Sequence, residues 1–216
     1  LEKLAQRGWL DAAELMPDPA FDARRVDFER VIPWRMSRLA LAAKRFAASA
    51  ASADRDALHA FCERHAKWLA DYTLFMAIAD IQPGRSWCDW DVGLALRDPA
   101  ALREAGAELA ERVAFHAFCQ WRFFEQWQRL KAYANDRGVR IVGDAPIFIA
   151  HQSAEVWSRP ELFELDARGA STVVAGVPPD YFSATGQRWG NPLYRWTAHA
   201  AEGYAWWIDR IRHAFE

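Results

Sequence analysis

The residues best suited to ligand chemistry gather in one segment, residues 176–196, which combines aromatic rings, amide and hydroxyl groups and backbone breakers. Flat rings cover the apolar face of a pyranose sugar, and neighbouring amides and hydroxyls can bond to its hydroxyl groups. Ordering such a stretch costs conformational entropy, which favours a functional reason for keeping rings on it. The segment indicates either a loop that covers a ligand or a surface loop pinned by its own aromatic cluster. The candidate ligand contacts are Tyr181, Phe182, Ser183, Gln187, Trp189 and Asn191.

The same segment carries turn-forming residues and no regular repeat. Proline fixes one backbone angle and glycine adopts conformations closed to other residues, so both types interrupt helices and strands. Neither helical nor strand periodicity is visible among the intervening side chains. We therefore predict an irregular loop. The interrupting residues are Gly176, Pro178, Pro179, Gly186, Gly190 and Pro192.

A second candidate is Asp144, which follows a short Val/Ile run that begins at Val139. A long helical pattern, the stop signal Gly138 and this run together resemble half of a β-α-β unit, which predicts a strand in a parallel sheet or barrel. Asp144 would lie at the carboxyl end of that strand. Because this end is the catalytic face of barrels, a carboxylate there is a functional candidate. The alternative is an aspartate that caps the turn before Pro146.

Composition limits the classes of partner. The chain has 216 residues, 52% hydrophobic and 26% charged, as expected of a globular protein, and its net charge of -2 gives no footprint for nucleic acid or acidic membranes. Three cysteines without metal-ligand spacing predict free thiols in a reducing compartment and no metal site. No run approaches the ~20 apolar residues of a membrane helix, and the first residues are not a signal peptide. We expect a cytoplasmic protein that needs no cofactor.

Helical patterns dominate the region before Val139. The last of them begins at Asp98, a good N-cap, with Pro99 in the first turn. Its middle part, residues 113–127, is apolar on nearly every face, so we expect other parts of the protein to enclose it. The predicted helices cover residues 34–48, 54–82 and 98–138.

Twelve tryptophans are a marked excess, and they divide by context. A ring on an apolar helical face is more often core than ligand platform, whereas a ring among breakers can be reached by a ligand. The first group, predicted to be core, is Trp68, Trp121 and Trp127. The second group, predicted to be accessible, is Trp87, Trp90 and Trp189.

Several motifs together resemble one enzyme family. The runs GDAPIFIAHQSAEVW (143–157), VVAGVPPDYFS (173–183) and GQRWGNPLY (186–194) are similar to motifs of the 4-α-glucanotransferases, also called amylomaltases or disproportionating enzymes, glycoside hydrolase family 77. Shorter matches at residues 25–28 and 71–76 extend the resemblance over almost the whole chain.

The resemblance implies an α/β fold, part of a (β/α)8 barrel with a large, mainly helical insertion, so that this chain is mostly helical. Residues 1–97 would form the insertion. Residues 98–216 would supply a long helix, a barrel strand, an active-site loop and the helix after it. The implied reaction is the transfer of α-1,4-glucan segments between maltodextrins by a retaining double displacement, which needs two carboxyl groups about 5 Å apart.

Carried over residue by residue, the resemblance assigns substrate binding and no catalytic role. Asp144 matches an aspartate near the subsite of the nucleophile. Tyr181 and Phe182 match a ring pair that stacks on the acceptor sugar. The polar and aromatic remainder of the same loop is matched by Gln187, Trp189 and Asn191, and the motif also includes Ser183 and Asp180.

The chain departs from the family pattern because the nucleophile strand, of the form Arg-x-Asp-His, is expected only after residue 216. We therefore expect this chain to be the central part of a longer enzyme, inactive by itself, and either self-associated or rearranged around its apolar faces. One alternative is a non-catalytic α-glucan-binding or structural module. Another, an oxidoreductase-like α/β domain, is disfavoured because no GxGxxG loop follows Val139.

Overall fold

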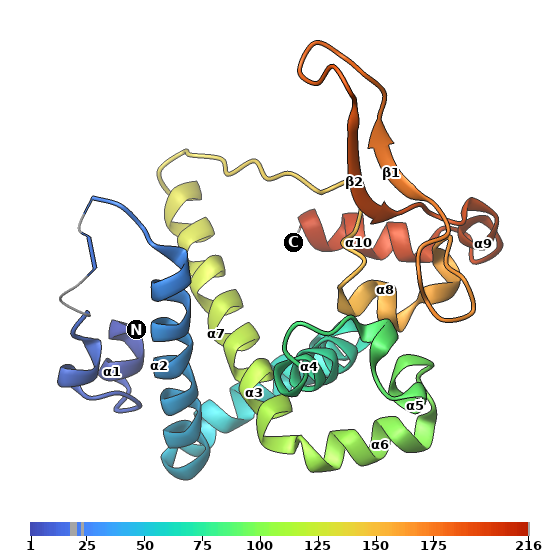
Figure 1. Ribbon diagram of the computed structural model, residues 1–216. Coiled ribbons are helices and arrows are strands. Elements are labelled where there is room, and N and C mark those ends of the chain that lie inside the picture. Colours follow the sequence, from blue (N-terminus) through green and yellow to red (C-terminus); the bar gives the residue numbers. More distant parts are fainter. Residues whose placement is uncertain (18–20, 23, 216) are drawn as a thin grey trace. The chain divides into compact units, whose positions relative to one another are not determined.

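The structure is a computed structural model that describes residues 1–17, 21, 22 and 24–215, and it is mostly helical, as expected (Figure 1). The elements up to residue 108 are α1 (Glu2–Gln6), η1 (Ala12–Leu15), α2 (Phe28–Ser49), α3 (Ser52–Arg64), α4 (Ala66–Ile81), η2 (Trp87–Asp89), α5 (Val92–Ala95) and α6 (Pro99–Glu108). They are followed by α7 (Ala110–Asn135), α8 (Ala154–Ser158), η3 (Pro160–Leu162), β1 (Val174–Val177), β2 (Gln187–Pro192), α9 (Trp196–Ala201) and α10 (Ala205–Phe215).

The predicted helices exist, but two of them are broken. The pattern over 54–82 divides into α3 and α4 at His65, and the pattern over 98–138 divides into α6 and α7 at Leu109. Both break residues leave the helical region, with φ and ψ of -105° and 13° at His65 and -99° and 18° at Leu109. Neither is a glycine or proline, so tertiary packing and not local propensity decides where these helices end.

Helix termini follow the sequence signals more closely. Asp98 caps α6, since its Oδ1 accepts hydrogen bonds from the backbone N–H groups of Ala100 (2.9 Å) and Ala101 (3.0 Å). At the other end, Gly138 has φ of 72° just after α7, and the next N–H, of Val139, bonds to the carbonyl of Ala134. A left-handed residue at this place suits glycine.

The chain forms two compact units, Leu1–Ala66 with Ala114–Arg129 and Lys67–Val113 with Leu130–Glu216. Neither unit begins at residue 98, where the expected division into an insertion and a barrel part lies. The first unit has an aromatic core in which the rings of Trp9 and Phe46 meet edge to face at 5.0 Å. Arg122 is buried in the same unit, with its guanidinium 4.8 Å from the Trp121 ring.

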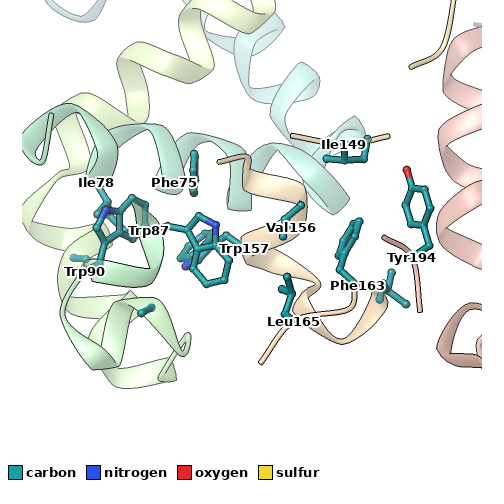
Figure 2. Packing of buried hydrophobic residues seen from close by; sticks show 13 residues of the cluster. Phe75, Ile78, Trp87, Trp90, Ile149, Val156, Trp157, Phe163, Leu165 and Tyr194 are labelled. Carbon is teal, nitrogen blue, oxygen red and sulfur yellow. The ribbon is translucent and has the colours of Figure 1, made fainter. Parts of the chain in front are cut away.

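The second unit is built around buried tryptophans (Figure 2). Trp157 donates its indole N–H to the carbonyl of Leu94 at 2.9 Å, and Trp87 donates to the carbonyl of His151 at 2.8 Å. Phe75 packs against both Trp90 and Trp157, with ring centroids 5.2 and 5.7 Å apart. The indole N–H groups of Trp157 and Trp87 thus find partners, whereas that of Trp90 is buried without one among the described residues, so Trp90 contributes through ring packing alone.

The structure contradicts part of the predicted division of the tryptophans into core and accessible residues. Trp87 and Trp90, expected to be accessible, are only 1% and 5% exposed. Trp127, expected to be core, is exposed, as is Phe123 on the same helix. The expectation that other parts of the whole protein enclose residues 113–127 stays a prediction, because this chain alone leaves part of that helix exposed. The sequence signal failed because the partners of both rings are distant in the sequence. Trp90 packs on Phe75 of α4 and Trp157 of α8, and Trp87 stacks on His151, although breakers flank both tryptophans.

The strand predicted to begin at Val139 is absent from the described structure. Residues 139–146 run without regular secondary structure, and Val142 is 90% exposed. A strand needs a neighbour to accept and donate its backbone hydrogen bonds. Within the described residues the only sheet is the antiparallel β1–β2 pair, and it does not include this segment.

Candidate functional site

The segment rich in rings forms a β-hairpin and not the irregular loop that was predicted. β1 and β2 pair antiparallel, with Gly176 opposite Arg188 and Val177 opposite Gln187. A β-carbon on Gly176 would come closer than 3.0 Å to the backbone oxygen of Gln187, so the two backbones can approach only because this residue is glycine. The glycine that was taken as a breaker is thus a condition for the pairing.

The tip of the hairpin is folded by its own hydrogen bonds. The Asp180 carboxylate accepts from the backbone N–H groups of Phe182 (2.9 Å) and Ser183 (2.8 Å). Ser183 donates its hydroxyl to the carbonyl of Gly186 at 2.7 Å, and Gly186 has φ of 73°. Aspartate, serine and left-handed glycine are the residues that fix tight turns in this way.

The side chains of the two aromatic residues at the hairpin tip are exposed to solvent. Tyr181 is 96% exposed and Phe182 is 86% exposed, and their ring centroids lie 5.5 Å apart at an interplanar angle of 88°. Figure 1 shows the hairpin extending away from the helices of its own unit. Exposing two large rings on a rigidly bonded turn has no benefit for folding, so it indicates a surface that binds something.

β2 carries the next three predicted site residues. Gln187 accepts a hydrogen bond from the indole N–H of Trp189 at 3.0 Å, which orients the ring along the strand. Trp189 is about half exposed and meets the ring of Phe148 edge to face at 6.0 Å. Asn191 donates its side-chain amide to the carbonyl of Ile149 at 3.0 Å. Gln187 and Trp189 lie two residues apart and their side chains bond to each other. An irregularity in the ladder and the positive φ of Gly190 (80°) separate them from Asn191.

Asp144 is placed apart from these residues in the sequence and lies in the extended segment after α7. It is exposed, and among the described residues its carboxylate has no hydrogen bond or ion pair. An ionised carboxylate with free lone pairs is an acceptor for ligand hydroxyls. The structure therefore brings together the hairpin residues and leaves Asp144 on a neighbouring segment of the same unit.

Tyr194 is the residue whose role the sequence did not indicate. Its ring is buried among Phe148, Phe163, Trp196, His199, Trp206 and Trp207, with centroids 5.1 to 6.1 Å away. Its hydroxyl donates to the carbonyl of Ile147 at 2.7 Å. Burial raises the pKa of Tyr194 to about 12, so the hydroxyl stays protonated and able to donate. The sequence could not reveal this role, because nothing in the neighbouring residues distinguishes Tyr194 from the other aromatic residues of the segment.

Other chemistry finds little support in the described part of the chain. No group of three or more metal-binding side chains comes together there. The three cysteines are free thiols, and burial raises the pKa of Cys119 to about 12, which disfavours a nucleophilic thiolate. No described helix is long and apolar enough to cross a membrane.

Comparison with known proteins decides the family. Residues 1–216 match the family described as 4-alpha-glucanotransferase over their whole length. The chain belongs to the 4-alpha-glucanotransferase family. This confirms the resemblance of the motifs at 143–157, 173–183 and 186–194.

Individual relatives within the 4-alpha-glucanotransferase family agree. The chain is 51% identical over 216 residues to a 4-alpha-glucanotransferase of Thermus thermophilus and 45% identical over 213 residues to one of Synechocystis. These matches cover 100% and 98% of this chain but 42% of each relative. The chain thus spans about two fifths of the length of the curated relatives it matches.

A solved structure of an amylomaltase from Streptococcus agalactiae in complex with acarbose superimposes with a TM-score of 0.92 at 34% identity. The superimposed part covers 98% of this chain and 43% of the amylomaltase chain. The arrangement of elements in this chain therefore occurs in a 4-alpha-glucanotransferase family member of known structure.

Proposed function

We propose that the whole protein transfers α-1,4-glucan segments between maltodextrins, and that this chain supplies the hairpin on the acceptor side of its site. The observation that carries the proposal is the exposed pair Tyr181 and Phe182 on a tip bonded to itself, in a chain of the 4-alpha-glucanotransferase family. The relative solved with acarbose supports a carbohydrate ligand.

The tip rings suit an acceptor sugar because two perpendicular faces offer apolar surface to the axial C–H groups of adjoining units. Lower on the hairpin, Trp189 adds a third ring held by Gln187, and both carry polar groups for sugar hydroxyls. Covering the acceptor site in this way would exclude water, which favours transfer over hydrolysis.

The carboxylates needed for retaining chemistry are proposed to come from parts of the whole protein other than this chain. Asp144 is proposed to bind substrate near the nucleophile and not to act as nucleophile itself, because one carboxylate cannot serve on both sides of one bond. The segment that follows α7 is proposed to become a barrel strand when neighbouring strands pair with it. The exposure of Val142 is consistent with an unpaired strand of this kind.

The test replaces Tyr181 and Phe182 by alanine in the whole protein and measures transfer and hydrolysis on maltotriose. Two lost stacking contacts, each about 0.5–1.5 kcal/mol, should raise the acceptor KM roughly tenfold and raise the ratio of hydrolysis to transfer. The pair Tyr181→Phe and Phe182→Tyr, which keeps both rings, should behave like the parent.

Thr185→Ala, an exposed position on the same tip, is the matched control for disturbing the turn. If the double alanine variant gives the parent's product distribution, the assignment of the tip to the acceptor site is wrong.

A further inference from the structure

The segment that follows Asp144 is held by side chains and not by backbone pairing. Between residues 146 and 149, three carbonyl groups accept hydrogen bonds from three side chains outside the segment, and just beyond it the Trp87 indole N–H bonds to the carbonyl of His151. Tyr194 donates its hydroxyl to Ile147 at 2.7 Å, Asn191 donates its amide to Ile149 at 3.0 Å, and Arg210 donates to Pro146 at 2.8 Å. We call Asn191, Tyr194 and Arg210 the carbonyl clamp.

The clamp has no backbone substitute among the described residues. From residue 140 to residue 152 no backbone N–H or carbonyl group takes part in a backbone–backbone hydrogen bond. Ile149 is buried, and a buried carbonyl without a partner costs about 1–3 kcal/mol, so the Asn191 bond removes that cost. Pro146 and Ile147 are exposed, so their two bonds replace bonds to water and fix the course of the chain. The clamp therefore holds residues 146–149, directly after the stretch that is proposed to pair as a strand in the whole protein.

Two of the three donors, Tyr194 and Arg210, are fixed by their own surroundings. The Tyr194 ring stacks on Phe148, which belongs to the held segment, with centroids 6.1 Å apart and planes 13° apart. The Arg210 guanidinium lies 5.3 Å from the Trp206 ring and pairs with Glu155 at 3.3 Å. A donor locked by packing holds its acceptor within a narrow range of positions.

The donors also connect separate elements to the segment. Asn191 comes from β2, the strand that carries Gln187 and Trp189, while Arg210 comes from α10. Because Pro146 is only two residues after Asp144, a shift at the clamp is passed to that carboxylate through two peptide units. The base of the hairpin and the Asp144 segment are thus held in one frame within the second unit.

We infer that Asn191, Tyr194 and Arg210 are positioning residues that set Asp144 relative to the hairpin, with Asn191 acting through Ile149. This inference rests on the proposed function, since it assigns the purpose of the clamp to substrate alignment. Small errors in the alignment of reacting groups are costly for rate, whereas acceptor stacking on the tip rings does not depend on the clamp.

The test has one arm on the 216-residue chain and one on the whole protein, both using Tyr194→Phe. This variant removes the hydroxyl and keeps the packed ring. In the chain, chymotrypsin cleavage after Phe148 should become about fivefold faster, as expected for losing a hydrogen bond of ordinary strength. In the whole protein, kcat for maltotriose transfer should fall about fivefold or more while the acceptor KM stays within about twofold.

Two further variants keep the inference testable if Tyr194→Phe folds poorly. Arg210→Met removes the donor to Pro146, and Arg210→Lys restores a cation that can donate. The lysine variant should recover part of both the protease resistance and the kcat that the methionine variant loses. Tyr204→Phe is the matched control, because Tyr204 is half exposed and its hydroxyl has no described partner.

The outcomes separate the clamp from the proposed function. Unchanged cleavage in both Tyr194→Phe and Arg210→Met would overturn the clamp itself. Faster cleavage with unchanged kcat would overturn the positioning role and leave a merely structural one. A raised acceptor KM with unchanged kcat would also overturn it, since the clamp would then shape the acceptor site. If the whole protein does not transfer glucan at all, the proposed function fails while the cleavage arm still decides whether the clamp exists.

Discussion

Replacing Gly169 by alanine should destabilise the second unit far more than the same change at Gly138. Gly169 has φ of 85° and closes a turn in which the Asp166 carboxylate accepts from the N–H groups of Arg168 (2.8 Å) and Ala170 (3.0 Å). A β-carbon there would come closer than 3.0 Å to two ring atoms of Trp87, which is 1% exposed.

The magnitude has two parts. A left-handed conformation costs a non-glycine residue about 1–2 kcal/mol. Forcing a methyl group against a packed ring adds about 1–3 kcal/mol, and Trp87 has little room to give because its indole N–H is bonded to His151. The free energy of unfolding should therefore fall by roughly 2–5 kcal/mol in Gly169→Ala.

Gly138→Ala isolates the backbone part. Gly138 has a similar φ of 72°, but nothing lies within 4 Å of an added β-carbon, so the loss should be only about 1–2 kcal/mol. Urea unfolding followed by tryptophan fluorescence measures both variants against the parent chain. Equal losses in the two variants would refute the steric argument, and would mean that Trp87 is not packed over Gly169.

Three further outcomes are expected. Burial raises the folded-state pKa of Tyr194 from the ordinary 10 to about 12. The stabilising contribution of its hydroxyl is therefore complete below pH 10 and is lost as the pH rises toward 12. Ultraviolet titration should show one late-titrating tyrosine, and this signal should be absent in Tyr194→Phe. Trp189→Ala, at a half-exposed ring, should lower kcat/KM of the whole protein while costing less than ~2 kcal/mol of stability; a larger loss of stability with unchanged kcat/KM would show the ring to be core. The isolated chain should transfer no glucose between maltotriose molecules, and detectable transfer would contradict this. Its exposed apolar residues, such as Val142 and Phe123, should be covered either by self-association or by a rearranged core, and a strict monomer at high concentration in light scattering would refute self-association and point to the rearranged core.

What the sequence predicts well is chemistry that local residues decide. The cap at Asp98 and the left-handed stop at Gly138 depend on a few neighbouring residues, and the structure has both. The family could be recognised because its motifs are contiguous runs. The tip rings Tyr181 and Phe182 are exposed, and their role as ligand contacts stays a prediction.

What the sequence predicts poorly depends on distant contacts. The helix breaks at His65 and Leu109 carry no breaker residue, and burial of Trp87 requires partners about 65 residues away, at His151 and Gln152. The hairpin was missed because a glycine in a strand and a glycine in a loop look alike until the opposing backbone is known. The Val139 run has the composition of a strand, but pairing partners and not composition make a strand.

The bonds at the hairpin tip make its shape a local property. Asp180, Ser183 and Gly186 close the turn among themselves, so the positions of the two rings are encoded within a stretch that begins and ends at the β1–β2 ladder. The residues of such a tip can be replaced together without changing the rest of the unit. If the proposed acceptor role holds, substituting the rings changes what the hairpin offers to an acceptor, while Asn191 and Tyr194 continue to fasten its base to the segment after Asp144. A library confined to residues 181, 182, 184 and 185 would then vary acceptor preference while keeping the three residues that close the turn and every tryptophan of the core.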